Sequence, residues 1–284
     1  TGKTSITAAF GSLAKNFVLA DCDVDAADLH LVMTPEIKER HDFSGGKQAR
    51  VIAEKCIGCG KCAKLCRFGA VGFNGPGNKD VAKTCTVDPV SCEGCKVCVE
   101  FCPVKAIEFE DAVNGQWFIS ETRFGPMVHA KFGIAEENSG KLVTLIRKQA
   151  KQIAQTRKKD LIIVDGSPGI GCPVIASITA SDLVLVVTEP TLSGIHDLER
   201  VTSLTANFGI KTLICVNKAD INPEMTERIE KEAAEKGLKL VGKIPYDEAF
   251  TKAQIIKATL IEYTGSEISE KVKSMFREVT YELG

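Results

Sequence analysis

The chain has 284 residues, 44% of them hydrophobic, and carries a formal net charge of −1 with a pI near 6.4. This length can bury one large core, or one core interrupted by a smaller domain. The near-neutral charge gives no reason to expect nucleic-acid binding. Because no signal peptide or apolar stretch of membrane-spanning length is visible, we expect a cytoplasmic protein whose thiols stay reduced.

The first residues, TGKTS from Thr1 to Ser5, are typical of the end of a phosphate-binding loop that runs into a helix. In such a loop, backbone N–H groups surround the phosphates, Lys3 would reach the terminal ones, and the hydroxyl of Thr4 would coordinate magnesium. The letters GKT alone are weak evidence. The leading glycine of the full pattern would precede Thr1, so we expect that the sequence begins inside the motif.

An apolar run, Phe17 to Ala20, then ends in Asp21, Asp23 and Asp25, which predicts a strand that delivers carboxylates. Much later, Leu161 to Val164 are continuously apolar and Asp165 follows them, in the pattern of a Walker B strand whose aspartate holds magnesium through its water shell.

Between these strands, eight of the twelve cysteines form two runs of one spacing, 36 residues apart: Cys56, Cys59, Cys62 and Cys66, then Cys92, Cys95, Cys98 and Cys102. Beyond the cysteines, Ala70, Val71 and Phe73 recur as Ala106, Ile107 and Phe109, so we predict a duplicated fold unit with its own core positions.

The spacing is that of bacterial ferredoxins, in which the fourth cysteine of each run binds the other cluster. We therefore expect two 4Fe-4S clusters with crossed ligands, one held by Cys56, Cys59, Cys62 and Cys102, the other by Cys92, Cys95, Cys98 and Cys66. Structural zinc sites or disulfides are the alternatives. Zinc sites usually show two separated C-x2-C pairs, and disulfides are rare in the cytosol.

Further apolar runs, Leu183 to Val187 and Thr212 to Val216, end in TEP and NKAD. Strands that alternate with helical segments predict a parallel sheet with its ligand at the carboxyl ends of the strands. Singly, Asp21 and Asp23 could cap a helix, and residues 217–220 could form a turn. The order of all these motifs favours a nucleotide hydrolase.

Taken together, TGKTS, DCDVDAADLHL, the two cysteine runs, ENSGKLV, VDGSPGIGCPVIAS, VTEPTLSGIHDLERV and VNKAD resemble the MinD/Mrp-type P-loop ATPases that carry an inserted ferredoxin domain, relatives of the nitrogenase iron protein. The phosphate loop of that family reads roughly K-G-G-x-G-K-[ST], and its first lysine reaches the partner's phosphates across a dimer. That lysine has no counterpart in this sequence.

The resemblance implies a site for ATP and Mg²⁺. In it, Lys3 and Asp23 would be catalytic, with Asp23 positioning the attacking water. Phosphate and magnesium would be bound by Gly2, Lys3, Thr4 and Ser5, with Asp21 and Asp165 supporting the metal. Asn217 would contact the base, and the segment around Pro245 would close over it. NKAD also matches the guanine-reading motif of GTPases, so GTP is the alternative nucleotide.

Cys172 lies seven residues after Asp165, the offset at which the nitrogenase iron protein places a cysteine that binds a cluster shared between subunits. The simpler interpretation is a buried or half-buried thiol, and the same holds for Cys22, Cys85 and Cys215. A C-terminal apolar stripe that includes Ile268, Val272 and Met275 is expected to pack on the domain, and no membrane binding is predicted from it.

We therefore predict an α/β fold, in which a parallel-sheet P-loop NTPase domain (1–45 and 117–284) is interrupted by a small α+β bacterial-type 2[4Fe-4S] ferredoxin domain (46–116). The expected function is ATP hydrolysis coupled to electron transfer, in a homodimer with an unknown redox or cluster-accepting protein partner. The alternatives are a cluster assembly or carrier factor and a redox-sensing regulatory ATPase.

Overall fold

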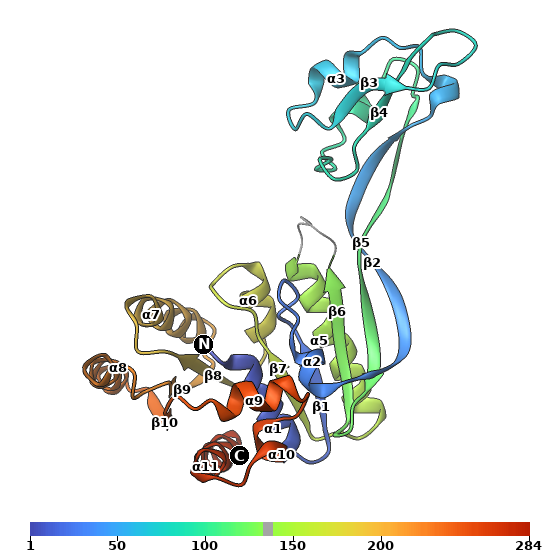
Figure 1. Ribbon diagram of the computed structural model, residues 1–284. Coiled ribbons are helices and arrows are strands. Elements are labelled where there is room, and N and C mark those ends of the chain that lie inside the picture. The colour runs from blue at the N-terminus through green and yellow to red at the C-terminus, as the bar shows by residue number, and fades with distance from the viewer. Residues whose placement is uncertain (133–138) are drawn as a thin grey trace. The chain divides into compact units, whose positions relative to one another are not determined.

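The computed structural model describes residues 1–132 and 139–284 and divides the chain into two compact units (Figure 1). The first unit contains Thr1–His41, Trp117–Lys131 and Ser139–Gly284, and the second contains Asp42–Gln116. Two long strands, β2 (Glu36–Val51) and β5 (Ile107–Glu121), contribute residues to both units.

In the first unit, one sheet has the strand order β2-β5-β6-β1-β7. Its members β1 (Phe17–Asp21), β6 (Pro126–Phe132) and β7 (Leu161–Asp165) are parallel. Strand β1 is buried along its whole length, and it packs with α1 (Lys3–Leu13) and α2 (Leu29–Met33) around Phe17, Leu19 and Met33. This continuous burial explains the uniformly apolar sequence that precedes Asp21.

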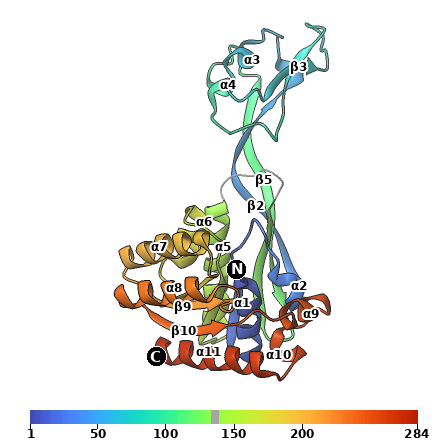
Figure 2. The same cartoon turned by 60° about the vertical axis from the view of Figure 1, so that its left-hand side comes forward.

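A second sheet of the first unit has the parallel order β10-β9-β8. Its strands are β8 (Leu183–Thr188), β9 (Lys211–Asn217) and β10 (Lys239–Ile244). Alternate residues of β9 face opposite layers: Ile214 and Val216 pack under α7 (Leu192–Asn207) and α8 (Pro223–Glu235), whereas Cys215 faces α11 (Glu267–Leu283). Figure 2 shows these helices on the two sides of the sheet.

The predicted packing of the C-terminal stripe is seen in α11, because Ile268, Val272 and Met275 are buried against α1 and the short helix α10 (Leu260–Tyr263). The remaining helices of this unit are α5 (Ser139–Thr156), α6 (Cys172–Ile178) and α9 (Ala249–Ile255). No helix in the described ranges, 1–132 and 139–284, is long and apolar enough to cross a membrane.

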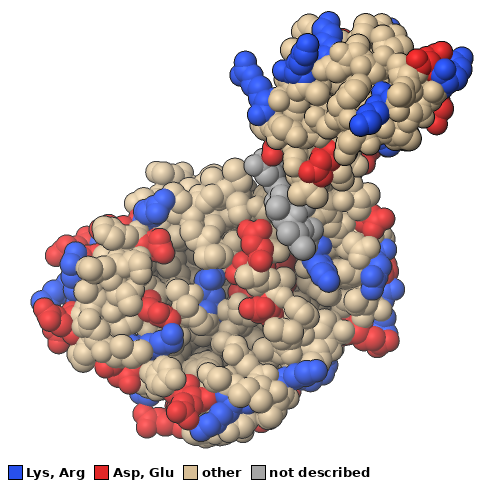
Figure 3. All heavy atoms as spheres, turned by 45° about the horizontal axis from the view of Figure 1, so that its top comes forward, with Lys and Arg blue, Asp and Glu red and all other residues tan. Residues whose placement is uncertain are grey.

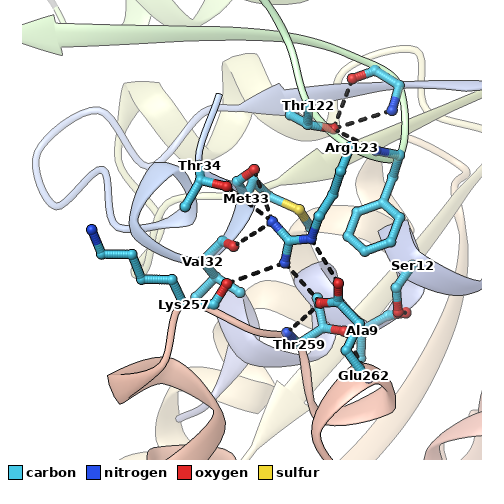
Figure 4. A network of polar contacts seen from close by, with 12 residues as sticks. Ala9, Ser12, Val32, Met33, Thr34, Thr122, Arg123, Lys257, Thr259 and Glu262 are labelled. Atoms are coloured by element: carbon cyan, nitrogen blue, oxygen red, sulfur yellow. Dashed lines mark hydrogen bonds and ion pairs between the residues drawn. The ribbon is translucent and has the colours of Figure 1, made fainter. Parts of the chain in front are cut away.

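The turn between β5 and β6 carries Arg123, whose guanidinium joins three segments of the first unit (Figure 4). It donates two 2.7 Å bonds to the carboxylate of Glu262 and further bonds to the carbonyls of Val32, Met33 and Lys257. The bonds to Val32 and Met33 satisfy carbonyl groups at the end of α2, where the last carbonyls of a helix have no partner within it. The carboxylate of Glu262 also accepts from the backbone N–H of Thr259, within a capping box at the start of α10.

The second unit is built from two related halves. It contains η1 (Ala53–Lys55), α3 (Lys61–Leu65), β3 (Val71–Gly75), β4 (Thr84–Val87) and α4 (Val97–Glu100), and β3 and β4 are antiparallel. The N–H of Ile52 donates to the carbonyl of Ala106, and the N–H of Asp88 donates to that of Ala70. These residue pairs are related by the 36-residue offset of the cysteine runs, so the duplication seen in the sequence extends to backbone hydrogen bonds.

Candidate functional site: a nucleotide-binding edge and two cysteine-lined cavities

Three acidic side chains gather in the first unit where β1 and β7 end. Asp21 and Asp165 are directly opposite each other in the parallel pairing of these strands, and the backbone N–H of Asp23 donates to Asp21 at 3.3 Å. The loops after the two strands are joined, because the hydroxyl of Ser167 donates to the carbonyl of Cys22 at 2.7 Å. The structure thus brings together Asp21 and Asp23 of one sequence motif and Asp165 of another.

These carboxylates are buried, with 1%, 6% and 1% of Asp21, Asp23 and Asp165 exposed. Burial raises the pKa of Asp165 to about 6, against the opposing effect of hydrogen bonds from Thr4 and Thr7 and of the charge of Lys3. Burial and the neighbouring Asp165 raise the pKa of Asp21 well above its ordinary value, and burial raises that of Asp23. The site therefore disfavours three negative charges that lack a cation.

One oxygen on each of these carboxylates, Oδ2 of Asp21, Oδ1 of Asp23 and Oδ2 of Asp165, is buried without a hydrogen-bond partner. Buried polar atoms without partners are costly, so these oxygens fit a bound cation and its water. Within residues 1–132 and 139–284, no three His, Cys, Asp or Glu side chains are grouped tightly enough to hold a metal ion by themselves. Mg²⁺ in proteins keeps several waters and is commonly bound through one or two carboxylates together with phosphate oxygens, and the unpartnered carboxylate oxygens fit such a site.

Helix α1 brings the basic and hydroxyl groups of the loop to the same place. Thr4 and Thr7 lie one turn apart and both lower the pKa of Asp165, and the Thr7 hydroxyl donates to its carboxylate at 3.1 Å. The charge of Lys3 acts on both Asp23 and Asp165. Ser5 lies to one side, where its hydroxyl accepts a bond from Gln254 at 2.9 Å. Thr7 was missed in the sequence, although its helical spacing from Lys3 and Thr4 could have indicated it.

Gly2 caps α1 with a φ of +82°, and a Cβ at this position would lie 2.4 Å from the amide nitrogen of Asn217. Asn217, at the end of β9, donates to the carbonyl of Thr1 at 2.9 Å. Ile244, the residue before Pro245, pairs with Asn217 across β9 and β10. The loops after these strands are also joined, since Asp220 accepts from the N–H of Tyr246. Asn217 and the Pro245 loop thus lie at the same strand ends as the phosphate loop.

In the second unit, the eight cysteines of the two runs line two cavities. One is lined by Cys56, Cys59, Cys62 and Cys102, and the other by Cys66, Cys92, Cys95 and Cys98. Each cavity thus draws three cysteines from one run and one from the other, the same grouping that the crossed assignment predicts. None of the twelve cysteines, all within the described ranges, forms a disulfide.

The rest of each cavity lining is largely apolar, with Val51, Ala106 and Ile107 in the first and Ala49, Ala70 and Val71 in the second. Four run cysteines around an apolar hollow fit the ligation of an iron–sulfur cluster, because four cysteine thiolates are the ligands that such clusters use. A fifth cysteine, Cys85, also lines the first cavity. The sequence interpretation treated Cys85 only as a core residue.

Two sequence expectations about individual side chains are wrong. Cys172 is exposed at the start of α6, not buried or half-buried. Phe73, expected at a core position of the repeat, is 48% exposed on β3, which forms a two-stranded sheet with β4. The other three cysteines outside the runs, Cys22, Cys85 and Cys215, are buried as expected.

The segment ENSGKLV is only partly described. Residues 137 and 138 lie outside the described residues, and from Ser139 onward the segment forms the first turns of α5.

On the face drawn in Figure 3, basic and acidic side chains are interspersed and neither sign forms a continuous patch over the described residues. This agrees with the near-neutral net charge of the chain.

Comparison with known proteins agrees with both parts of the fold. Residues 55–106 match the family described as "4Fe-4S dicluster domain". The uncharacterized protein MJ0578 of Methanocaldococcus jannaschii is 30% identical over 281 residues, which are 98% of this chain and 92% of that protein. The uncharacterized ATP-binding protein MJ0823 of the same organism is 33% identical over 102 residues, 35% of this chain and 39% of that protein.

Among solved structures, the septum site-determining protein MinD from Pyrococcus horikoshii, complexed with Mg-ADP, is similar with a TM-score of 0.57 at 16% identity, covering 100% of this chain and 92% of that one. The predicted fold class, a MinD-type P-loop fold that carries a ferredoxin domain, is therefore confirmed.

Proposed function

The chain belongs to the same family as the uncharacterized protein MJ0578 of Methanocaldococcus jannaschii, and from that premise we propose that it is an ATP-hydrolysing iron–sulfur protein in which nucleotide turnover controls electron transfer through two 4Fe-4S clusters. The observation that carries the proposal is the presence of two sites in one chain: buried carboxylates with unpartnered oxygens beside a phosphate loop, and two cavities lined by four run cysteines each.

In the first unit, the N–H groups at the start of α1 and the charge of Lys3 would hold the phosphates of ATP. Thr4, Asp21 and Asp165 would hold Mg²⁺, largely through its waters. Asp23 has an unpartnered oxygen and a pKa raised by burial, so it would orient the water that attacks the terminal phosphate and accept a hydrogen bond from it. Asn217 and the loop at Pro245 would contact the base.

We assign ATP rather than GTP because the fold is that of MinD, and because MJ0823, similar over about a third of this chain, is described as ATP-binding. The residues that would hold the clusters are the four cysteines of each cavity. When bound, such clusters supply one-electron transfer. The apolar lining of the cavities would limit access of water to them.

The link between the two activities lies in the chain order. The loop with Asp23 leads into α2 and then directly into β2, which carries the chain from the first unit into the second, and β5 carries it back. A change in the loop after Asp23 when the terminal phosphate is lost would therefore act on the segment that enters the second unit. We propose that a homodimer rearranges in this way and presents the clusters to a redox partner.

The test uses the complete gene product, prepared without oxygen and reduced with dithionite. We expect EPR signals of two interacting 4Fe-4S clusters that change when Mg²⁺ and ATP are added, and a changed rate of cluster reoxidation by a one-electron dye. Asp23→Asn should keep ATP binding and lose the changes that need hydrolysis. Identical spectra and reoxidation rates with and without Mg-ATP, alongside normal hydrolysis, would favour the regulatory ATPase instead.

A second candidate function, a cluster carrier or assembly factor, is favoured by one observation, the exposure of Cys172 at the start of α6. An exposed thiol at this position could bind a cluster shared with a second copy of the chain. No C-x2-C pair follows Cys102, however, as a carrier of the Mrp type would have. Transfer of labelled iron to an apo-ferredoxin, lost in Cys172→Ala, would establish the carrier function.

A further inference from the structure

The two cysteine-lined cavities are related position by position through the 36-residue repeat, and they differ at one sulfur. Val51 lines the first cavity and its counterpart Val87 lines the second. Cys85 lines the first cavity, whereas its counterpart in the second is Ala49. The first cavity therefore has five cysteines and the second has four.

Cys85 lies in β4, with 2% of its surface exposed. It belongs to one buried cluster with Cys56, and Cys62 and Cys102 pack against that cluster. Cys85 is thus buried beside the sulfur ligands of the first cavity, whose lining it shares.

A thiol can donate one weak hydrogen bond through its S–H group. A cysteine that ligates iron is a thiolate, so the Cys62 sulfur can only accept, and a hydrogen bond between the neighbouring Cys62 and Cys85 side chains would be donated by Cys85. Hydrogen bonds to cluster sulfurs are among the factors that set cluster reduction potentials. Reduction adds one negative charge to the cluster and its sulfurs, so a donor at Cys62 stabilises the reduced state.

We propose that Cys85 is not a ligand but a hydrogen-bond donor that makes the cluster of the first cavity easier to reduce than the cluster of the second. This inference rests on the proposed function only in that both cavities hold clusters. One electron from a low-potential reductant enters the cluster, and no bond forms or breaks in the protein. Electrons would accordingly collect at the cavity of Cys56, Cys59, Cys62 and Cys102.

The experiment is a redox titration of the complete gene product, without oxygen and with dithionite and mediators, followed by EPR. We expect two distinct potentials in the wild type. Cys85→Ala installs the residue of the other half and should lower the higher of the two potentials by roughly 59 mV. For a one-electron centre, this shift is about a tenfold change in the ratio of reduced to oxidised cluster. Cys85→Ser keeps a donor and should retain most of the difference between the clusters.

The reciprocal variant, Ala49→Cys, should raise the lower potential, that of the second cavity. The control is Cys215→Ala, which removes a buried thiol of the first unit and should change neither potential. If Cys85→Ala does not fold, the serine variant and Ala49→Cys carry the test. Iron and sulfide analysis, with two clusters expected per chain, accompanies each variant.

Two unchanged potentials in a fully loaded Cys85→Ala protein would overturn the proposal. Loss of one cluster in this variant would also overturn it, because Cys85 would then be needed to hold the cluster. A wild-type protein that contains no clusters would instead refute the proposed function, so the two failures are distinguishable.

Discussion

The two units of the chain are held together by different kinds of side chain. In the first unit, large apolar residues such as Phe17, Leu19 and Ile214 are fully buried between sheet and helices. In the second unit, Phe43 and Ile107 are buried, but most of the buried hydrophobic residues are small ones, such as Cys56, Cys85 and Ala106. Because such a core offers little to offset the conformational entropy of some 75 residues, we expect the second unit to depend on its metal groups to fold and the first not to.

Removal of iron should therefore have the largest effect of the changes considered, and it should destabilise the second unit only. After anaerobic chelation under mild oxidation, we expect amide hydrogens in residues 42–116 to lose their protection against exchange, because the cavities lose the groups that fill them. Peptides from β1, β7 and β9 should keep theirs. Hydrogen exchange followed by mass spectrometry measures both units in one sample. Retained protection across 42–116 would show that the second unit folds on apolar contacts alone.

Substitution in the phosphate loop should instead affect ATP hydrolysis by the first unit and leave the clusters of the second unit unchanged. Lys3→Ala removes the charge that would contact the terminal phosphates, and we expect the ATPase rate to fall by a factor of about 10² or more. The EPR signals without nucleotide should be unchanged, since the cysteine cavities contain no residue of the first unit. The matched control is Lys15→Ala, an exposed lysine just after α1, which should hydrolyse ATP normally. Wild-type turnover by Lys3→Ala would refute the assigned site.

Two arginine substitutions, one in each unit, compare how much a network of polar contacts contributes to the stability of that unit. Arg123→Met in the first unit removes bonds to Glu262 and to three carbonyl groups, and we expect it to lower the free energy of unfolding by about 2–3 kcal/mol. The control in the second unit is Arg50→Met, which breaks an exposed pair with Glu108 and Glu110 and should have no measurable effect. Urea titration followed by the fluorescence of the single tryptophan, Trp117, reports on the first unit, and thermal loss of cluster absorbance reports on the second. If wild type and Arg123→Met have the same free energy of unfolding, the hydrogen bonds of Arg123 make no net contribution to the stability of the first unit.

The smallest expected effect is a pH dependence in the first unit. Hydrogen bonds from Arg123 lower the pKa of Glu262 to about 2. A carboxyl group whose pKa is lower in the folded state stabilises that state fully above its unfolded pKa, near 4.5, and this contribution is lost as the pH falls toward 2. The stability difference between wild type and Arg123→Met should thus shrink by about 1–2 kcal/mol between pH 5 and pH 2.5, after allowance for solvent screening. A difference that is constant over this range would show that Glu262 does not titrate with Arg123.

The sequence predicts the second unit well because its signals are local and repeated. Spacing within each run brings cysteines to one cavity, and the family pattern supplies the crossed fourth ligand. The same 36-residue offset relates Cys85 to Ala49, so a comparison extended beyond the runs could have found the fifth cysteine. The exposure of Phe73 was not predictable in this way, because it depends on which layers cover β3.

In the first unit, the strands that end in Asp21, Asp165 and Asn217 are recognisable from uninterrupted apolar runs. Parallel pairing places the ends of β1 and β7 together, whereas β9 belongs to the other sheet. Contacts between distant loops leave no such periodic signal. Arg123 lies 90 residues from Met33 and 139 from Glu262, and nothing near it in the sequence indicates either partner. The extent of β2 and β5, which run through both units, was likewise not indicated by hydrophobic pattern, because their exposed polar residues obscure it.

The crossing of the two cysteine runs also orders events during synthesis on the ribosome. The set of Cys56, Cys59 and Cys62 is made first, yet its cavity is completed only by Cys102, the last cysteine of both runs. The other cavity, begun with Cys66, is complete as soon as Cys98 is made. A cluster in the first cavity would therefore find its four ligands only once the second run has been made. Neither run supplies all four cysteines of a cavity, so removal of one run would leave both cavities incomplete.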